Sequence, residues 1–267
     1  MPDDPLIARL VGVHKRFAGG PPVLAGVDLD FRRGETTVVL GPSGAGKSVT
    51  LKHIVGLVKP DAGEVYFDGT RIDTLSERRL NRVRTRLGFL FQLGALFDSM
   101  TVAENLAFPL REHTDARAGE RSARVEEALA LVDMAGAGPK MPAELSGGQQ
   151  KRIALARAII LRPTLILYDE PTTGLDPARA DGINDLIIKL QRELEVSSIV
   201  VTHDLASATR VGDRVVVLLD GLVAADGSMD EIRASTNPAV RGFLAGRYGD
   251  QDAAMAAATE DRDGRET

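Results

Sequence analysis

The chain has 267 residues and a net charge of −5 at pH 7, so no overall positive field draws it to nucleic acid. It has no cysteine, which excludes disulfides and thiolate metal sites and fits the cytosol. Hydrophobic residues make up 43%, yet no apolar run approaches the ~20 residues of a membrane-spanning helix. We therefore expect a soluble globular chain that reaches a membrane only through partners.

The first third of the chain alternates between predicted strands and turns. Residues 27–31 alternate apolar and polar positions, which predicts a half-buried strand. The β-branched run "TTVVL" at 36–40 is typical of a strand buried on both faces. A glycine-rich turn and a helix through Leu57 follow, and "GEVYFDG" at 63–69 predicts another short strand.

The middle of the chain is predicted to be mainly helical. Five arginines lie between Arg78 and Arg86, with Leu80, Val83 and Leu87 on one helical face. This pattern favours a solvated amphipathic helix, and contact with a partner or with anionic lipid is the alternative. A second amphipathic helix is expected around 121–134. The whole stretch from about 95 to 162 reads as a helical insertion or subdomain.

The last third returns to strands of the buried type. They are predicted at 165–169, 198–203 and 215–221. A helix is expected over 177–195, with Asp176 as its cap and Pro177 in its first turn. Strands that alternate with helices predict a mostly parallel sheet with helices on both faces. The tail from Gly249 is rich in alanine and charge without an apolar period, so we expect it to be disordered.

The segment "GPSGAGKS" at 41–48 matches the phosphate-binding pattern G-x-x-x-x-G-K-[ST] between a buried strand and a helix. Its glycines let backbone N–H groups face phosphate oxygens, Lys47 would reach the β- and γ-phosphates, and Ser48 would bind Mg²⁺. A chance glycine-rich turn is the alternative. The predicted ATP-binding residues are Gly41, Pro42, Ser43, Gly44, Ala45, Gly46, Lys47, Ser48 and Val49.

Two further strand ends carry candidate catalytic groups. Asp169 ends the strand in "LILYDE" and is placed to bind Mg²⁺, and Glu170 is a candidate base for the attacking water. A solvated loop is the alternative for this acidic pair. His203 ends the strand "SIVVTH" and could donate a hydrogen bond to a γ-phosphate oxygen, with a purely structural histidine as the alternative.

The segment "LSGGQQKR" at 145–152 predicts a second phosphate-binding surface. Ser146 can cap the helix that begins at the glycines, which leaves free N–H groups at a positive helix end. A simple helix cap is the alternative. The residues assigned to this surface are Ser146, Gly147, Gly148 and Gln149.

These motifs occur in the order, and closely resemble the sequence, of the ATPase subunit of ATP-binding cassette (ABC) transporters. The resemblance covers residues 6–245 and includes "PTTGLDP" at 171–177. It implies one α/β domain over 1–248, with a P-loop NTPase core and a mostly parallel sheet. N-terminal antiparallel strands and an inserted helical subdomain complete the expected fold. It also implies a Mg²⁺-dependent ATPase with ATP and Mg²⁺ as ligands.

The resemblance assigns roles to three more residues. Phe17 matches the aromatic residue that stacks on adenine, although a core phenylalanine is a rival interpretation. Gln92, the one amide in the apolar stretch "FLFQLGALFD", matches the glutamine that touches Mg²⁺ or the attacking water and senses the membrane subunit. A bond to a nearby backbone carbonyl is its alternative. Asp176 matches the loop that crosses the interface of a head-to-tail dimer, so a second copy of the chain is expected.

Two segments are more specific than these general motifs. Residues 90–114 and the segment "NPAVRGFLAGR" at 237–247 resemble the ATPases of MCE-domain phospholipid transport systems of the maintenance-of-lipid-asymmetry type. One departure is Gln149, where many of those relatives carry methionine. This resemblance implies a membrane permease and an MCE-domain protein as partners, and a peripheral location on the cytoplasmic face of the inner membrane.

Three other functions remain open at this stage. An ABC ATPase for another substrate, such as amino acids or lipoproteins, would share all the chemistry. A non-transport ABC ATPase in DNA repair or translation would usually carry a coiled-coil insertion, tandem cassettes or a basic surface, none of which the sequence shows. A nucleotide-binding module without turnover is expected to lack Glu170 or His203, and both are present.

Overall fold

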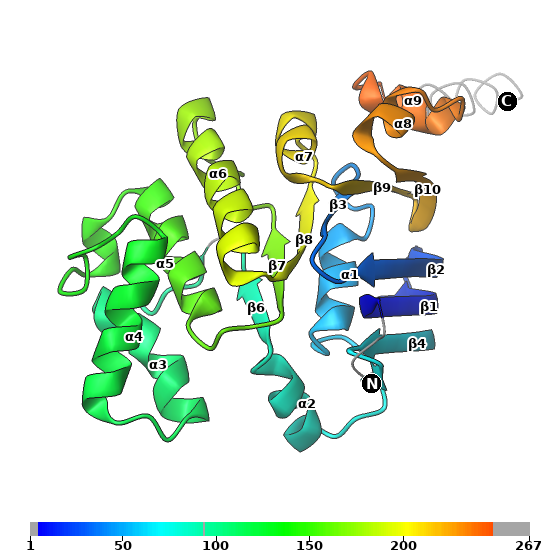
Figure 1. The fold of residues 1–267 in the computed structure, drawn as a ribbon. Helices are drawn as coiled ribbons and strands as arrows, with labels where there is room; N and C mark the ends of the chain where they lie inside the picture. Colours follow the sequence, from blue (N-terminus) through cyan, green and yellow to red (C-terminus); the bar gives the residue numbers. More distant parts are fainter. Residues whose placement is uncertain (1–4, 93, 248–267) are drawn as a thin grey trace, which may run out of the picture.

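Two β-sheets pack against helix α1 (Lys47–Ile54) in the computed structural model, which describes residues 5–92 and 94–247 (Figure 1). The first sheet is antiparallel, with the strand order β2-β1-β4-β5. The second has six strands in the order β10-β9-β3-β8-β7-β6, and all neighbours from β9 to β6 are parallel. The mostly parallel sheet and the N-terminal antiparallel strands confirm the predicted fold class.

The antiparallel sheet is more extensive than the sequence pattern indicates. The strand expected at 27–31 runs over Pro22–Arg32, because it pairs along its length with a long first strand. The short strand expected at 63–69 ends at Phe67. The strands of this sheet are β1 (Leu6–Arg16), β2 (Pro22–Arg32), β4 (Ala62–Phe67) and β5 (Thr70–Arg71).

The parallel sheet has a hydrophobic core on each face, as its β-branched strands predict. Val39 of β3 packs toward the antiparallel sheet and α1, while its neighbours Val38 and Leu40 pack toward the helices on the other face. The strands of this sheet are β3 (Thr36–Leu40), β6 (Leu87–Leu90), β7 (Leu165–Asp169), β8 (Ser197–Thr202), β9 (Arg214–Leu219) and β10 (Leu222–Gly227).

Helices follow β6 for most of the middle of the chain. Figure 1 shows α3, α4 and α5 gathered at one end of the parallel sheet, with α6 and α7 standing beside each other next to them. The remaining elements are α2 (Glu77–Arg84), α3 (Val102–His113), α4 (Ala118–Leu131), a 3₁₀ turn (Pro142–Glu144), α5 (Gly147–Ile159), α6 (Pro177–Leu194), α7 (Leu205–Val211), α8 (Met229–Arg233) and α9 (Pro238–Leu244).

Three predicted boundaries differ from those in the structure. The arginine-rich helix expected to reach Leu87 ends at Arg84, because Leu87 pairs with Leu165 at the start of β6. The strand expected at 198–203 ends at Thr202, which leaves His203 beyond the sheet. The strand expected at 215–221 ends at Leu219, since Asp220 and Gly221 both adopt positive φ and turn the chain into β10.

Within the described part of the chain, no helix combines the length and apolar character needed to span a bilayer. The tail from Gly249, which we expect to be disordered, lies outside the described residues.

Candidate functional site

The phosphate loop connects the buried strand β3 to α1, and two of its glycines lie too close to other backbone atoms to carry a side chain. A Cβ at Gly41 would lie 2.3 Å from the carbonyl oxygen of Leu218, and one at Gly46 would lie 2.7 Å from that of Val23. Gly46 also has a φ of 98° and caps α1 without any side-chain hydrogen bond. The first N–H groups of α1 are therefore left for a ligand, as the sequence predicts.

Lys47 folds back over this loop. Its Nζ donates hydrogen bonds to the carbonyl oxygens of Gly41 and Pro42, at 2.7 and 2.9 Å, and lies 3.5 Å from a Glu170 carboxylate oxygen. Burial lowers the pKa of Lys47 below its usual value, although the nearby Glu170 carboxylate opposes this shift. The ammonium group is therefore held at the mouth of the loop in a site that favours an added negative charge.

Ser48 and Asp169 meet across the end of the sheet. The Ser48 hydroxyl donates to Asp169 Oδ1 at 2.6 Å, although the two residues are 121 positions apart in the sequence. Burial raises the pKa of Asp169 above its usual value, and this effect exceeds that of the Ser48 hydrogen bond, which lowers it. A cation placed beside this carboxylate would stabilise its charged form.

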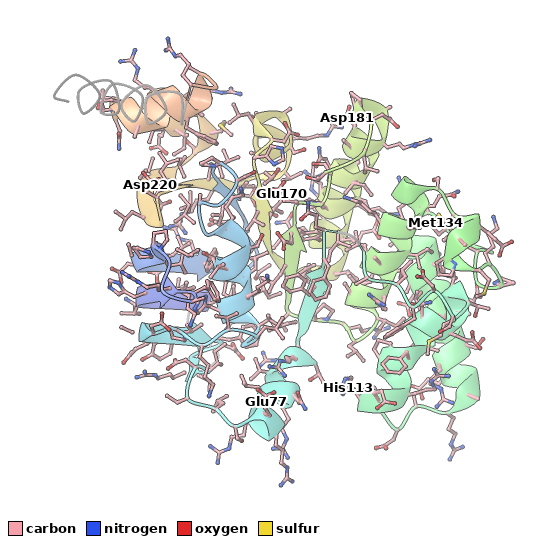
Figure 2. All side chains as sticks on the ribbon, turned by 180° about the vertical axis from the view of Figure 1, so that it is seen from behind. Glu77, His113, Met134, Glu170, Asp181 and Asp220 are labelled. Atoms are coloured by element: carbon pink, nitrogen blue, oxygen red, sulfur yellow. The ribbon has the colours of Figure 1, made fainter. Side chains whose placement is uncertain are left out.

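Glu170 lies in the middle of the molecule, at the end of β7 (Figure 2). One of its carboxylate oxygens lies 2.9 Å from His203 Nδ1, and it accepts a 3.2 Å hydrogen bond from the Thr173 hydroxyl. Its backbone has a φ of 50°, a left-handed conformation that costs about 1–3 kcal/mol for a residue with a side chain. Strain of this kind persists only where the surroundings hold it in place.

Lys151 is the residue of this site that the sequence reasoning missed. Its Nζ donates to the carbonyl oxygens of Pro171 and Thr173, at 2.7 and 2.8 Å, directly after Glu170. A signal for it existed in the sequence, since Lys151 occupies the buried stripe of α5 together with Gly148 and Leu155. A lysine in such a stripe requires polar partners, but the pattern does not reveal which ones.

The second predicted surface forms at the start of α5. The Ser146 hydroxyl accepts a hydrogen bond from the Gln149 N–H, while the Gln149 side chain accepts one from the Ser146 N–H. A Cβ at Gly147 would meet nothing within 4 Å, so this helix end is open. In Figure 1, α5 and α1 lie on opposite sides of β7 and β8, so the two surfaces predicted to bind phosphate are separated within a single chain.

Asp176 lies beside that second surface. It caps α6 by accepting a hydrogen bond from the Arg179 N–H at 3.0 Å, and its carboxylate also pairs with the Arg179 side chain at 3.2 Å. The same arginine packs next to Gly148, where a Cβ would lie 3.5 Å from its Cδ. The structure thus brings the starts of α5 and α6 together.

Gln92 and Phe17 are both exposed. Phe91 and Gln92 follow the buried Leu90, and both are exposed although the stretch around them is apolar. Within residues 5–92 and 94–247, no hydrogen bond joins the Gln92 side chain to a backbone carbonyl, and its contact with the nucleotide site stays a prediction. The exposed fraction of Phe17 is 45%, which excludes a core role for it.

The donor set suits a magnesium-bound triphosphate better than a metal held by protein alone. In the described part of the chain, no three histidine, aspartate or glutamate side chains come close enough to hold a metal ion. A cation beside Asp169 would need the Ser48 hydroxyl and ligand oxygens to complete its shell, which is how Mg²⁺ commonly binds next to phosphates. Anionic phosphates would in turn stabilise the buried Lys47 ammonium.

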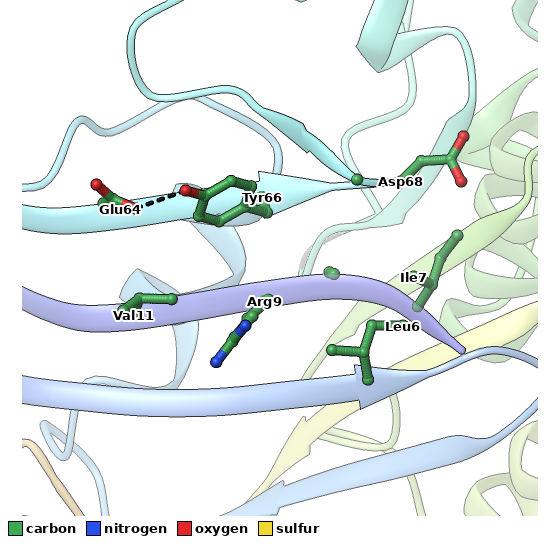
Figure 3. A pocket seen from close by; sticks show the side chains of 9 residues that line it. Leu6, Ile7, Arg9, Val11, Glu64, Tyr66 and Asp68 are labelled. Atoms are coloured by element: carbon green, nitrogen blue, oxygen red, sulfur yellow. Dashed lines mark hydrogen bonds between the residues drawn. The ribbon is translucent and has the colours of Figure 1, made fainter. Parts of the chain in front are cut away.

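A cavity of about 420 Å³ on the antiparallel sheet is a poorer candidate (Figure 3). Its polar groups already have partners, since the Tyr66 hydroxyl donates to Glu64 at 2.5 Å and Arg9 pairs with Asp30, outside the cavity lining, at 3.0 Å. Glu64 also accepts from Arg71. The site at the end of the parallel sheet therefore remains the candidate.

The N-terminal cap of helix α7, directly after His203, offers a test of how much this region contributes to the stability of the fold. Asp204 caps α7 by accepting hydrogen bonds from the N–H groups of Ala206 and Ser207, at 3.0 and 3.1 Å. Burial alone would raise the pKa of Asp204, but the hydrogen bonds from Ser207 and Ala206 outweigh it and leave the pKa below its usual value. A lowered carboxyl pKa stabilises the fold above its unfolded value of about 3.9, and this stabilisation is lost as the pH falls.

We therefore expect Asp204→Ala to lower the free energy of unfolding at pH 7 by about 0.5–2 kcal/mol, the usual cost of a lost helix cap. Urea unfolding should show that the difference from the wild type shrinks as the pH is lowered through about 4. Asp204→Asn is the control, because asparagine also caps helices but carries no charge. A wild-type advantage over Asp204→Ala that is the same at every pH would contradict the role of the charged carboxylate.

The sequence is similar to one protein family and to individual known proteins over most of its length. Residues 24–173 match the family described as ABC transporter. The chain is 44% identical to the intermembrane phospholipid transport system ATP-binding protein MlaF of Escherichia coli K12, over 82% of each protein. It is 43% identical to the probable ribonucleotide transport ATP-binding protein mkl of Mycobacterium leprae, over 88% of this chain and 68% of that protein.

A solved structure shows the same fold. The dimeric post-hydrolysis state of the ATP-binding cassette MJ0796, bound to ADP and Pi, superposes with a TM-score of 0.77 at 35% sequence identity. The superposition covers 83% of this chain and 98% of that one.

Proposed function

The chain belongs to the ABC transporter family and is an ATP-hydrolysing subunit, and from this premise we propose that it powers phospholipid transport between the inner and outer membranes. It would act with an integral-membrane permease and an MCE-domain protein, on the cytoplasmic face of the inner membrane. The observation that carries this proposal is the E. coli phospholipid-transport relative, which this chain matches along most of both sequences. The segments 90–114 and 237–247 support the same assignment.

Two copies of the chain would enclose each ATP. One copy contributes the phosphate loop, with Lys47 at the phosphates and with Ser48 and Asp169 toward Mg²⁺. The other contributes the capped start of α5 at Ser146, because the two surfaces lie on opposite sides of β7 and β8 in one chain. Asp176, next to that second surface, would lie in the interface between the copies.

Within this clamp, the residues around Glu170 perform the chemistry. The Glu170 carboxylate orients and deprotonates the attacking water, and His203, which already contacts Glu170, donates a hydrogen bond toward the γ-phosphate. Bound Mg²⁺ would supply charge neutralisation of the phosphates. The exposed Gln92 and Phe17 would face the ligand, the first as a sensor of metal and permease and the second as a stacking surface for adenine.

The closed state depends on the γ-phosphate, because that group accepts hydrogen bonds from both copies. Hydrolysis removes it and opens the clamp, and the segment after Gln92 passes this change to the permease. The mycobacterial relative favours a second candidate substrate, ribonucleotides, which would use the same clamp.

The two substrates can be separated by isolating the assembled complex. We expect the chain to purify from membranes with a multi-pass permease and an MCE-domain protein, whose genes should be its neighbours. ATP hydrolysis by the reconstituted complex should rise with phospholipid in the bilayer and remain unchanged by added ribonucleotides other than ATP. Stimulation by those ribonucleotides alone would overturn the phospholipid assignment in favour of the second candidate.

A further inference from the structure

We propose that Lys151 is a positioning residue for hydrolysis: from helix α5, it holds the strained backbone that carries Glu170. This inference rests on the proposed role of Glu170 as the base. It concerns a residue outside the phosphate loop and outside the open start of α5, and it assigns Lys151 a function within its own chain rather than toward the second copy.

The contacts of Lys151 converge on one short segment. Its ammonium group has three N–H donors, and they meet the carbonyl oxygens of Pro171 at 2.7 Å, Thr173 at 2.8 Å and Glu170 at 3.4 Å. The exposed fraction of Lys151 is 8%. In the described part of the chain, no carboxylate forms an ion pair with Lys151. Its ammonium group donates to backbone carbonyl oxygens instead.

Lys151 donates to more backbone carbonyls of segment 170–173 than any other side chain in the described part of the chain. Glu170 keeps its positive φ through a hydrogen bond from its N–H to the Val201 carbonyl, at 3.0 Å, and a weak turn from the Thr173 N–H to its own carbonyl, at 3.2 Å. Lys151 adds three hydrogen bonds to the carbonyls of this segment, beside the side-chain contacts of Glu170 and Thr172. Without the bonds from Lys151, the backbone after Glu170 can relax, and its carboxylate would move away from His203 and from the water that it must orient.

The position of Lys151 on α5 also relates Glu170 to the nucleotide of the second copy. It lies five residues after Ser146 on the same helix, a rise of about 7.5 Å along the axis. In the proposed dimer, the start of α5 covers the nucleotide of the second copy. A shift of α5 on closure is therefore transmitted through Lys151 to the Glu170 of its own chain, which links the two ATP sites through one rigid helix.

The test compares three variants of the full chain, in the assembled dimer or complex. Lys151→Met keeps the apolar stem but removes the donors, and Lys151→Arg restores a buried cation. Lys189→Met is the matched control, because Lys189 also donates to a backbone carbonyl, that of Leu131 at 2.9 Å, and pairs with Asp133, away from the segment 170–173.

We expect Lys151→Met to reduce kcat about 100-fold, the usual effect of a small misplacement of a catalytic group, with KM and ATP affinity changed less than about threefold. Lys151→Arg should recover most of kcat, and Lys189→Met should keep it. A Lys151→Met enzyme with wild-type kcat, or Arg and Met variants with equal kcat, would overturn the inference.

Two further outcomes are distinguishable. If Lys151→Met does not fold, Lys151→Gln should fold and show an intermediate kcat, since its amide can donate to two carbonyls. Wild-type kcat in the Lys151→Gln variant would also overturn the inference. If the wild-type complex itself hydrolyses no ATP, the proposed function fails, because that result does not depend on position 151.

Discussion

Glu170→Gln is expected to slow ATP turnover by about 10²–10⁴-fold and to leave ATP binding intact. The amide keeps the size of the side chain and can still contact His203, which lies 2.9 Å from the carboxylate in the wild type. It cannot accept a proton from water, so the chemical step stops while the closed clamp forms. The measurements are steady-state ATPase rates and equilibrium binding of labelled ATP.

The same variant should accumulate as a dimer with ATP and Mg²⁺, because the γ-phosphate that joins the two copies is no longer removed. Size-exclusion chromatography with and without ATP would detect this shift in mass. The control is Glu195→Gln, at the exposed end of α6, which should hydrolyse ATP at the wild-type rate. A Glu170→Gln protein with normal turnover would show that another group acts as the base.

The second large effect is expected from Lys47→Ala, which should weaken ATP binding rather than the chemical step. Lys47 is the buried cation of the phosphate loop, and its Nζ lies on the loop carbonyls of Gly41 and Pro42. A hydrogen bond to a charged group contributes about 1.5–3 kcal/mol, so removing the ammonium group from the phosphates should raise the Kd for ATP by at least about tenfold.

Equilibrium binding of labelled ATP decides this prediction, and Lys59→Ala provides the control at an exposed lysine of the following loop. The two variants should remain equally folded by circular dichroism. Unchanged ATP affinity in Lys47→Ala would mean that the loop binds phosphate through its backbone alone, and that the lysine serves only to hold the loop closed.

The sequence by itself determined the parts of this protein that depend on local chemistry. The β-branched run of β3 and the apolar run of β7 specify strands that are buried on both faces, and Ser146 and Asp176 cap their helices through groups three residues away. The glycine-rich loop shows in its sequence that Gly46 can adopt the positive φ that precedes α1. The caps and the loop are thus encoded by nearby residues, whereas the need for glycine at position 41 comes from the distant Leu218 carbonyl.

Only the tertiary structure decided which distant groups meet. The antiparallel pairing of β1 lengthened β2, and the bond between Ser48 and Asp169 joins residues that no periodicity relates. The exposure of Gln92 contradicts the apolar pattern around it, because β6 ends at Leu90. Lys151 is the clearest case: a helical stripe indicates that it is buried, but its acceptors are the carbonyls of a strained loop about 20 residues away. A buried charge selects its partners by geometry in space, and sequence spacing does not contain that geometry.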